Sequence, residues 1–171
     1  VLKPGGEFYI SDIVADRRLP ESIREDKKLL AECLGGALYE YDLLDTITAA
    51  GFRDPRGVSR SLVEENVGGQ PNRFFSMTLR GFKFEEPLDL RCEDFAQHAT
   101  YRGNCPGSEE SFLLDLNHLF EKDSARSVCR NTARMLSETR LSRYFEVSGE
   151  LEHRGIFDCS SPSPGEAPSC C

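Results

Sequence analysis

The residues of this chain best suited to do chemistry are its seven cysteines, in a sequence of 171 residues. Their number is odd, no two form a Cys-x-x-Cys pair and no histidine lies at zinc-finger spacing, so a disulfide framework is not indicated. Two interpretations stay open: reduced thiols that are buried or incidental, or a subset that binds a soft metal or metalloid through sulfur. Spacing alone does not separate them. The seven are Cys33, Cys92, Cys105, Cys129, Cys159, Cys170 and Cys171.

The three histidines, His98, His118 and His153, are isolated from one another in the sequence. His118 lies on the apolar face of a predicted strand. We expect it to be a buried core residue rather than an acid or base.

Composition excludes several classes of partner. The net charge is -8 and the isoelectric point is near 5.0, which argues against nucleic acid or an anionic membrane surface, since both attract Lys and Arg patches. No apolar run approaches the ~20 residues that span a bilayer. The hydrophobic content of 39% is enough for a core.

The elements around Cys33 can be predicted from local patterns. A Pro-Gly-Gly turn at residues 4–6 precedes an aromatic and β-branched run at 8–14, which indicates a buried strand. Pro20 is suited to a first helical turn, and acidic residues follow it, so residues 20–34 are predicted to be a helix. Cys33 would lie near the end of this helix, before Gly35 and Gly36.

The next segment is predicted to be a helix followed by a hairpin. Residues 42–50 are amphipathic and end at Gly51. Residues 58–63 and 73–84 have the character of strands, and the second shows period-two alternation. A loop at residues 68–72 joins them, which predicts an antiparallel pair at a sheet edge.

A second region follows from about residue 85. Apolar and polar residues alternate over 112–121, which predicts a strand, and residues 131–145 are predicted to be a helix. Residues 159–171 are rich in Ser and Pro and are expected to form a disordered tail.

Several of these segments together resemble the arsenite methyltransferases. The most specific is residues 32–39 (ECLGGALY), and the strand at 73–83 (RFFSMTLRGFK) continues the match. The resemblance covers about residues 1–150 and corresponds to the C-terminal half of a family member. Further matching stretches are residues 19–24, 51–52, 91–92 and 136–145.

This resemblance implies an α/β fold: the C-terminal part of a Rossmann-like class I methyltransferase sheet, followed by a small α+β C-terminal domain. The corresponding boundaries are 1–84 for the methyltransferase part with its arsenic-binding cysteine, 85–158 for the small domain and 159–171 for the tail.

The activity that the resemblance implies is methyl transfer from S-adenosylmethionine to trivalent arsenic held by cysteine thiolates, in arsenic detoxification. Cys33 matches a family arsenic-binding cysteine and is the residue expected to be both catalytic and an arsenic ligand. Arsenite prefers three thiols, whereas two suffice for a monomethylated arsenical. A reductant such as glutathione or thioredoxin, and a cytoplasmic location, are implied with it.

The sequence departs from the family pattern at two places. Asn72 stands where the family usually has another binding cysteine, so the site would be incomplete unless Cys92, Cys105 or the Cys170–Cys171 pair substitutes. The glycine-rich loop that binds the cofactor is expected upstream of residue 1, and the Gly-Gly pairs present here do not form one. We therefore expect this chain alone neither to bind S-adenosylmethionine well nor to turn over.

Two alternatives remain at this point. The chain could belong to another small-molecule S-adenosylmethionine-dependent methyltransferase, in which Cys33 would only pack. It could also be a non-catalytic truncated remnant that acts as a binding module.

Overall fold

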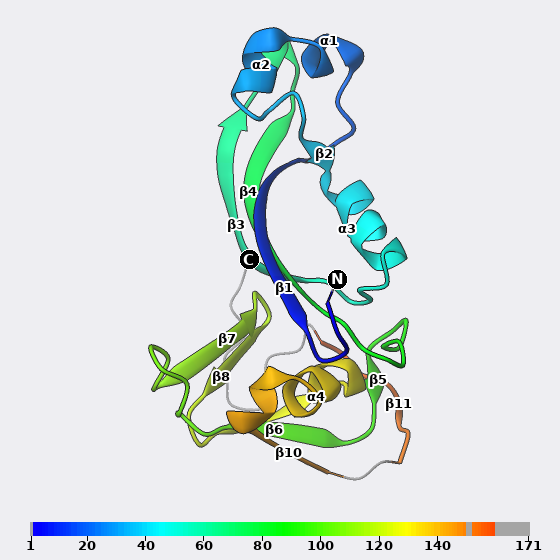
Figure 1. Cartoon of the computed structure of the whole chain (residues 1–171), viewed down its shortest axis with the longest axis vertical. Helices are drawn as coiled ribbons and strands as arrows, with labels where there is room; N and C mark the ends of the chain where they lie inside the picture. The colour runs from blue at the N-terminus through cyan, green and yellow to red at the C-terminus, as the bar shows by residue number, and fades with distance from the viewer. Residues whose placement is uncertain (1, 150–151, 160–171) are drawn as a thin grey trace. The chain divides into compact units, whose positions relative to one another are not determined.

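The computed structural model describes residues 2–149 and 152–159. Within these residues the chain forms two compact units (Figure 1). The N-terminal unit is Glu7–Gly81, and the C-terminal unit takes in the residues before Glu7 and those from Phe82 onward. None of the helices in the described part of the chain has the length and apolar content of a membrane span.

The N-terminal unit is built on a four-stranded sheet in the order β2-β1-β4-β3. Strand β1 (Glu7–Ala15) confirms the predicted strand and pairs in parallel with the short β2 (Leu38–Tyr39). Strands β3 (Arg56–Glu65) and β4 (Arg73–Phe82) are antiparallel, as the predicted hairpin requires, and the short 3₁₀ helix η1 (Val67–Gly69) lies in their connection.

Helix α3 (Glu40–Ala49) packs on one face of this sheet. Its Ile47 joins Val14 of β1 and the odd-numbered apolar residues of β4 in one buried cluster. Phe74, on the opposite parity of β4, belongs to a different cluster. The period-two pattern therefore separates the two faces of β4, as the sequence indicated.

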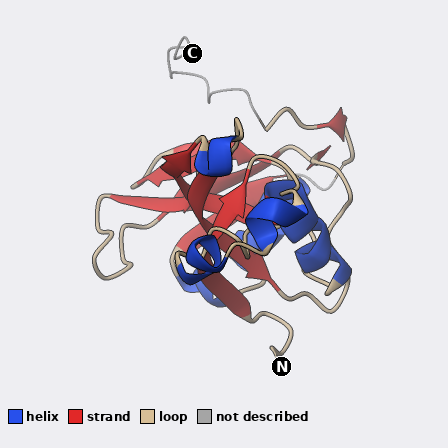
Figure 2. Ribbon diagram, turned by 90° about the horizontal axis from the view of Figure 1, so that it is seen from above, coloured by secondary structure: helices blue, strands red, loops and turns tan. Residues whose placement is uncertain are grey.

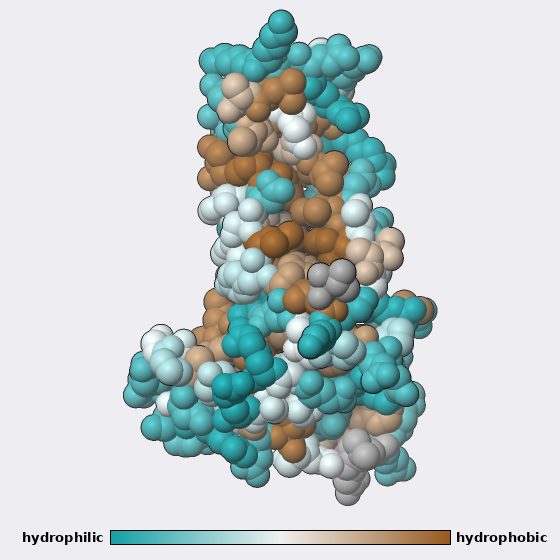
Figure 3. Space-filling view, in the orientation of Figure 1, coloured by the Kyte–Doolittle hydropathy of each residue, from teal (hydrophilic) through white to brown (hydrophobic). Residues whose placement is uncertain are grey.

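Strand β1 buries only its C-terminal end. Val14 and Ala15 are fully buried, whereas Tyr9 and Ile10 are exposed. Exposed apolar side chains also occur on β3, at Leu62 and Val63. Figure 3, in the orientation of Figure 1, shows apolar surface in brown over the region of these strands. The apolar run of β1 therefore predicted a strand correctly without predicting which of its residues reach the core.

The single helix predicted over residues 20–34 is wrong. Two short helices form instead, α1 (Glu21–Arg24) and α2 (Lys27–Ala31). The break is at Asp26, whose backbone is extended and whose Oδ1 accepts hydrogen bonds from the amides of Lys28 (2.8 Å) and Leu29 (3.0 Å). An aspartate that caps a helix in this way starts a new helix rather than continuing the old one.

The C-terminal unit contains a three-stranded antiparallel sheet. Figure 2 shows the strands of the chain in red and its helices in blue. Strand β6 (Gln97–Tyr101) lies between β10 (Phe145–Gly149) and β9 (Ala125–Val128). Helix α4 (Arg130–Ser137) supplies Ala133, Met135 and Leu136 to the core. A two-stranded ladder pairs β5 (Glu93–Asp94) with β11 (Gly155–Ile156).

The strand predicted over residues 112–121 is a hairpin, β7 (Ser111–Asp115) and β8 (His118–Glu121). Asp115 makes the turn, because its Oδ1 accepts from the Asn117 amide at 2.9 Å and lies 2.7 Å from Nδ1 of His118. His118 is only 3% exposed, which confirms it as a core histidine.

The helix predicted over residues 131–145 ends early. Thr139 is extended, and its hydroxyl donates to the Met135 carbonyl (2.6 Å) and accepts from the Leu141 amide (3.2 Å). These bonds end α4 and begin the 3₁₀ helix η2 (Arg140–Arg143). The rest of the predicted helix is η2 and the start of β10.

Asp16 joins the end of β1 to the start of β4. Its carboxylate accepts from the Arg73 amide (3.1 Å) and from Nε of Arg17 (3.0 Å) and of Arg73 (3.3 Å). The hydrogen bond from Arg17, and then those from Arg73, hold the pKa of Asp16 well below its ordinary value, although burial acts in the opposite direction. The folded chain therefore favours the ionised carboxylate more than the unfolded chain does.

We expect Asp16→Asn to lower the free energy of unfolding by about 1 kcal/mol at neutral pH, where the carboxylate is ionised in both states. The deficit should shrink below about pH 4, the ordinary pKa of an aspartate, and vanish as the pH falls through the lower folded value. Urea unfolding of both proteins at pH 7 and pH 3 measures this. Asp45→Asn, at an exposed carboxylate of α3, is the control. A deficit equal at both pH values would contradict the ionic role of Asp16.

Candidate functional site

Cys33 lies just beyond α2, in a backbone conformation unusual for a residue with a side chain. Its φ is +64°, in the left-handed region that glycine favours, and its amide donates to the Leu30 carbonyl at 3.1 Å. The amides of Leu34 and Gly35 both donate to the Leu29 carbonyl at 2.9 Å. The turn leaves the Cys33 side chain exposed while Leu34 enters the core.

Gly35 allows this turn to pack closely. A Cβ added to Gly35 would lie 3.0 Å from the Ile23 carbonyl oxygen and 3.1 Å from the backbone nitrogen of Leu30. A Cβ on Gly36 would meet nothing within 4 Å. Only the first glycine of the pair is therefore required by its surroundings.

Asn72, at the position where the resemblance leads one to expect a cysteine, has a structural role. The side chain is 1% exposed, its Oδ1 accepts from the Val67 amide at 2.9 Å, and its Nδ2 donates to the Val67 carbonyl at 3.2 Å. The Asn72 carbonyl also accepts from the Asn66 amide at 2.8 Å. Val67 shares an apolar cluster with Leu34, the neighbour of Cys33. The amide of Asn72 thus closes the loop between β3 and β4.

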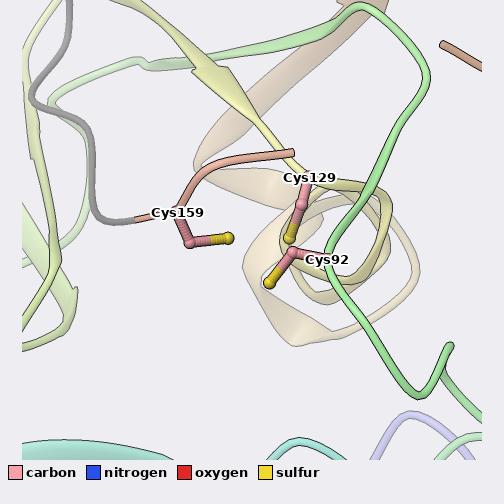
Figure 4. Close-up of side chains that lie close together, drawn as sticks. All are labelled: Cys92, Cys129 and Cys159. Carbon is pink, nitrogen blue, oxygen red and sulfur yellow. The ribbon is translucent and has the colours of Figure 1, made fainter. Parts of the chain in front are cut away.

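Three cysteines of the C-terminal unit converge (Figure 4). The sulfur atoms of Cys92, Cys129 and Cys159 all lie within 4.8 Å of one another. Cys92 was one of the thiols considered as a substitute ligand, but Cys105, considered with it, is not in this cluster. The Cys170–Cys171 pair lies outside the described residues.

The sequence did not single out Cys129 or Cys159. Each is separated from the others by many residues, so no spacing motif marks them. The only signal was the number of cysteines itself. The Ser/Pro-rich composition of residues 159–171 predicts a disordered tail, whereas the structure places Cys159 with two thiols of the folded unit. Residues 160–171 lie outside the described part of the chain.

Backbone pairing brings the Cys92 and Cys159 segments together, and Cys129 lies at the start of a helix. Cys92 immediately precedes β5, and its carbonyl accepts from the Phe157 amide at 2.7 Å, which extends the β5–β11 ladder by one bond. Cys159 follows two residues after Phe157. Cys129 is the residue between β9 and α4 and is the N-cap of this helix.

The side chain of Asn131 holds the loop that leads to Cys92 through two hydrogen bonds to its backbone. Asn131, near the start of α4, accepts from the Asp89 amide at 2.9 Å and donates to the Asp89 carbonyl at 3.0 Å. Both backbone groups of Asp89 are therefore held by the helix that begins beside Cys129. This arrangement fixes the approach of the Cys92 segment to α4.

The three thiols differ in burial. Cys129 is fully buried, and its sulfur lies 3.4 Å from the Thr132 hydroxyl oxygen. Cys92 and Cys159 are half-buried. The hydrogen bond with the Cys129 thiol, then burial and the Cys92 thiol, raise the pKa of Cys159 above that of an ordinary cysteine. Burial and the two neighbouring thiols therefore favour the neutral thiol of Cys159 over its thiolate.

A pocket of about 780 Å³ also lies in the C-terminal unit. Charged side chains of both signs line it. Among them, Nε of Arg134 lies 2.9 Å from Oε1 of Glu138 in an ion pair. No cysteine lines this pocket, so it is separate from the thiol cluster. Its lining residues are Pro4, Gly5, Phe84, Glu85, Glu86, Phe95, Gln97, Arg130, Arg134, Ser137 and Glu138.

A family model described as the arsenite methyltransferase C-terminal domain matches residues 95–167. The chain is 41% identical over its full length to an arsenite methyltransferase of Aquipseudomonas alcaligenes, 53% of which it covers. It is 38% identical over 96% of its length to the arsenite methyltransferase of Mus musculus, 42% of which it covers.

The chain matches the C-terminal part of arsenite methyltransferases. It spans about half the length of the curated relatives that it matches.

A solved structure supports the fold assignment. The crystal structure of an arsenic(III) S-adenosylmethionine methyltransferase from Chlamydomonas reinhardtii superimposes with a TM-score of 0.85 at 38% identity, covering 92% of this chain and 55% of the algal one. This confirms the fold expected from the sequence, the C-terminal part of a class I methyltransferase with mixed α/β structure. The region that matches the C-terminal domain family, residues 95–167, includes Cys129 and Cys159 and begins after Cys92.

The glycine pair beside Cys33 gives a matched test of this part of the arsenite methyltransferase fold. We expect Gly35→Ala to lower the free energy of unfolding by about 1–3 kcal/mol, because the new methyl group presses on backbone atoms of Ile23 and Leu30. Gly36→Ala should be neutral or stabilising by up to about 1 kcal/mol, since it only restricts the unfolded chain. Denaturant unfolding compares the two variants. Equal effects would show that the close approach at Gly35 does not support the turn.

Proposed function

We propose that this chain is the C-terminal part of an enzyme that transfers a methyl group from S-adenosylmethionine to trivalent arsenic, and that Cys33 is one of the arsenic ligands. The observation that carries the proposal is the exposed thiol of Cys33, held outward by a left-handed turn in a chain that matches arsenite methyltransferases. Trivalent arsenic is thiophilic, and soft sulfur donors select soft metals and metalloids.

On this proposal the residues 1–84 contribute to the methyltransferase domain and residues 85–158 form the small C-terminal domain. The substrate is a trivalent arsenical, glutathione or thioredoxin keeps the thiols reduced, and the enzyme acts in the cytoplasm. Arsenic detoxification is the corresponding physiological role.

S-adenosylmethionine would supply the methyl group. The residues of this chain do not fit a cofactor-binding loop: its Gly-Gly pairs do not form a GxGxxG motif, Gly35 is packed against backbone, and a Cβ on Gly68 would lie 3.3 Å from the Ile23 side chain. We therefore assign the cofactor no residue of this chain. The contribution of the chain is to hold and orient the arsenical.

Two features of the N-terminal unit define that contribution. Cys33 exchanges a hydroxyl of the arsenical for its sulfur, and the thiol proton and the hydroxyl leave as water. Asn72 supplies no sulfur and is engaged with Val67. A second thiol for the Cys33 site must therefore come from elsewhere in the enzyme.

The alternative of an ordinary small-molecule methyltransferase requires Cys33 to be a packing residue. Its exposure argues against this, because the adjacent Leu34, 6% exposed, is the residue that fills the core. The alternative of a non-catalytic binding module retains arsenical binding and differs only in turnover.

We expect phenylarsine oxide, a stand-in for a monomethylated arsenical, to protect Cys33 from alkylation in the reduced chain when glutathione is present to supply the second thiol. Mass spectrometry of peptides after iodoacetamide treatment reports each thiol separately, so protection elsewhere does not obscure the result. Cys105, half-buried and outside the thiol cluster, is the internal control and should be alkylated equally with and without the arsenical.

Protection of Cys33 should persist in Cys105→Ser. Full alkylation of Cys33 at saturating phenylarsine oxide would contradict its role as a ligand and leave only the fold assignment standing.

A further inference from the structure

We propose that Cys92, Cys129 and Cys159 form a second arsenic site, which binds inorganic arsenite through three sulfur atoms in the C-terminal unit. The inference rests on the proposed function for the identity of the ligand, whereas the geometry of the site stands by itself.

The size of the sulfur triangle suits one central atom. With every sulfur within 4.8 Å of the other two, an atom at the centre lies at most about 2.8 Å from each. This is only a few tenths of an ångström longer than a zinc–sulfur bond of about 2.3 Å. The three sulfurs would therefore have to draw in by only a few tenths of an ångström to reach a bond of that length.

The site is built from three separate parts of the unit. Cys129 is fixed at the junction of β9 and α4, and its backbone carbonyl accepts from the Ala133 amide at 2.9 Å. Cys92 is held through the β5–β11 ladder and through the pairing of Asn131 with Asp89. Convergence of side chains from such distant positions is expected of a preorganised ligand site.

The donor set favours trivalent arsenic over zinc. Structural zinc is bound by four protein ligands in a tetrahedron. In the described parts of the chain, 2–149 and 152–159, no histidine, aspartate or glutamate joins the three cysteines as a fourth ligand. Trivalent arsenic forms three bonds and keeps a lone pair in the fourth direction, so three thiols complete its coordination.

Binding requires no oxidant or reductant. Arsenite is As(OH)₃ at neutral pH, and each thiol replaces one hydroxyl: three arsenic–sulfur bonds form, three arsenic–oxygen bonds break, and three water molecules leave. Neutral thiols are suitable reactants for this exchange, since every thiol proton departs in water. The arsenic stays trivalent.

The bound arsenic would cross-link the chain. It would join the segment after β11, which carries Cys159, to the start of α4 and to the loop before β5. Because a ligand that binds only the folded state stabilises it, arsenite should raise the unfolding temperature of the chain.

The test measures bound arsenic per chain, by elemental mass spectrometry after desalting, with arsenite as the probe. Wild type, Cys33→Ser and Cys105→Ser should each retain one arsenic at this site and show the rise in unfolding temperature. Cys159→Ser and Cys92→Ser should bind more than about tenfold more weakly, since even the removal of groups that merely support metal ligands costs that much. Cys129 is fully buried, so the two half-buried cysteines are the safer positions to change.

Two results would overturn the inference. One is retention of arsenite at the wild-type level by folded Cys159→Ser and Cys92→Ser. Another is zinc bound at one equivalent by the wild type that arsenite does not displace. The test is independent of the proposed function, because loss of arsenical protection at Cys33 with arsenite still bound by the three cysteines would reject the first site and support the second.

Discussion

The left-handed turn at Cys33 is the constraint on which the chemistry of the N-terminal unit depends. A side chain at positive φ is disfavoured, and this one is held by the Leu30 and Leu29 carbonyls and by the close packing of Gly35 against Ile23. The same turn directs Leu34 inward. The turn thus leaves the Cys33 thiol exposed, and the parallel pairing of β1 with β2 anchors the following segment to the sheet.

The two units hold sulfur in different ways. Cys33 is a single exposed thiol, whereas Cys92, Cys129 and Cys159 form a compact group with one fully buried member. On the proposed function, these arrangements suit different arsenicals: three thiols would satisfy arsenite, whereas Cys33 would need a second thiol that Asn72 does not provide. Asn72 is tied to the backbone of Val67, so its presence at this position has a structural reason.

Local patterns predicted the strands better than the helices. The alternation in β4 and the turn before β1 depend on neighbouring residues, so sequence was sufficient there. The predictions of one helix at 20–34 and one strand at 112–121 were wrong. In each segment an aspartate, Asp26 or Asp115, accepts a hydrogen bond from a nearby backbone amide and interrupts the element. Cys33 could be nominated by its motif. The three-cysteine group could not, since it arises from strand pairing and helix position between residues far apart in the chain.

The most direct test of this account is an anomalous difference map from crystals of the reduced chain treated with phenylarsine oxide and glutathione. The account predicts an arsenic peak bonded to the sulfur of Cys33. Arsenic found at other thiols, with an unmodified Cys33 in the same crystals, would contradict the assignment of Cys33 as an arsenic ligand.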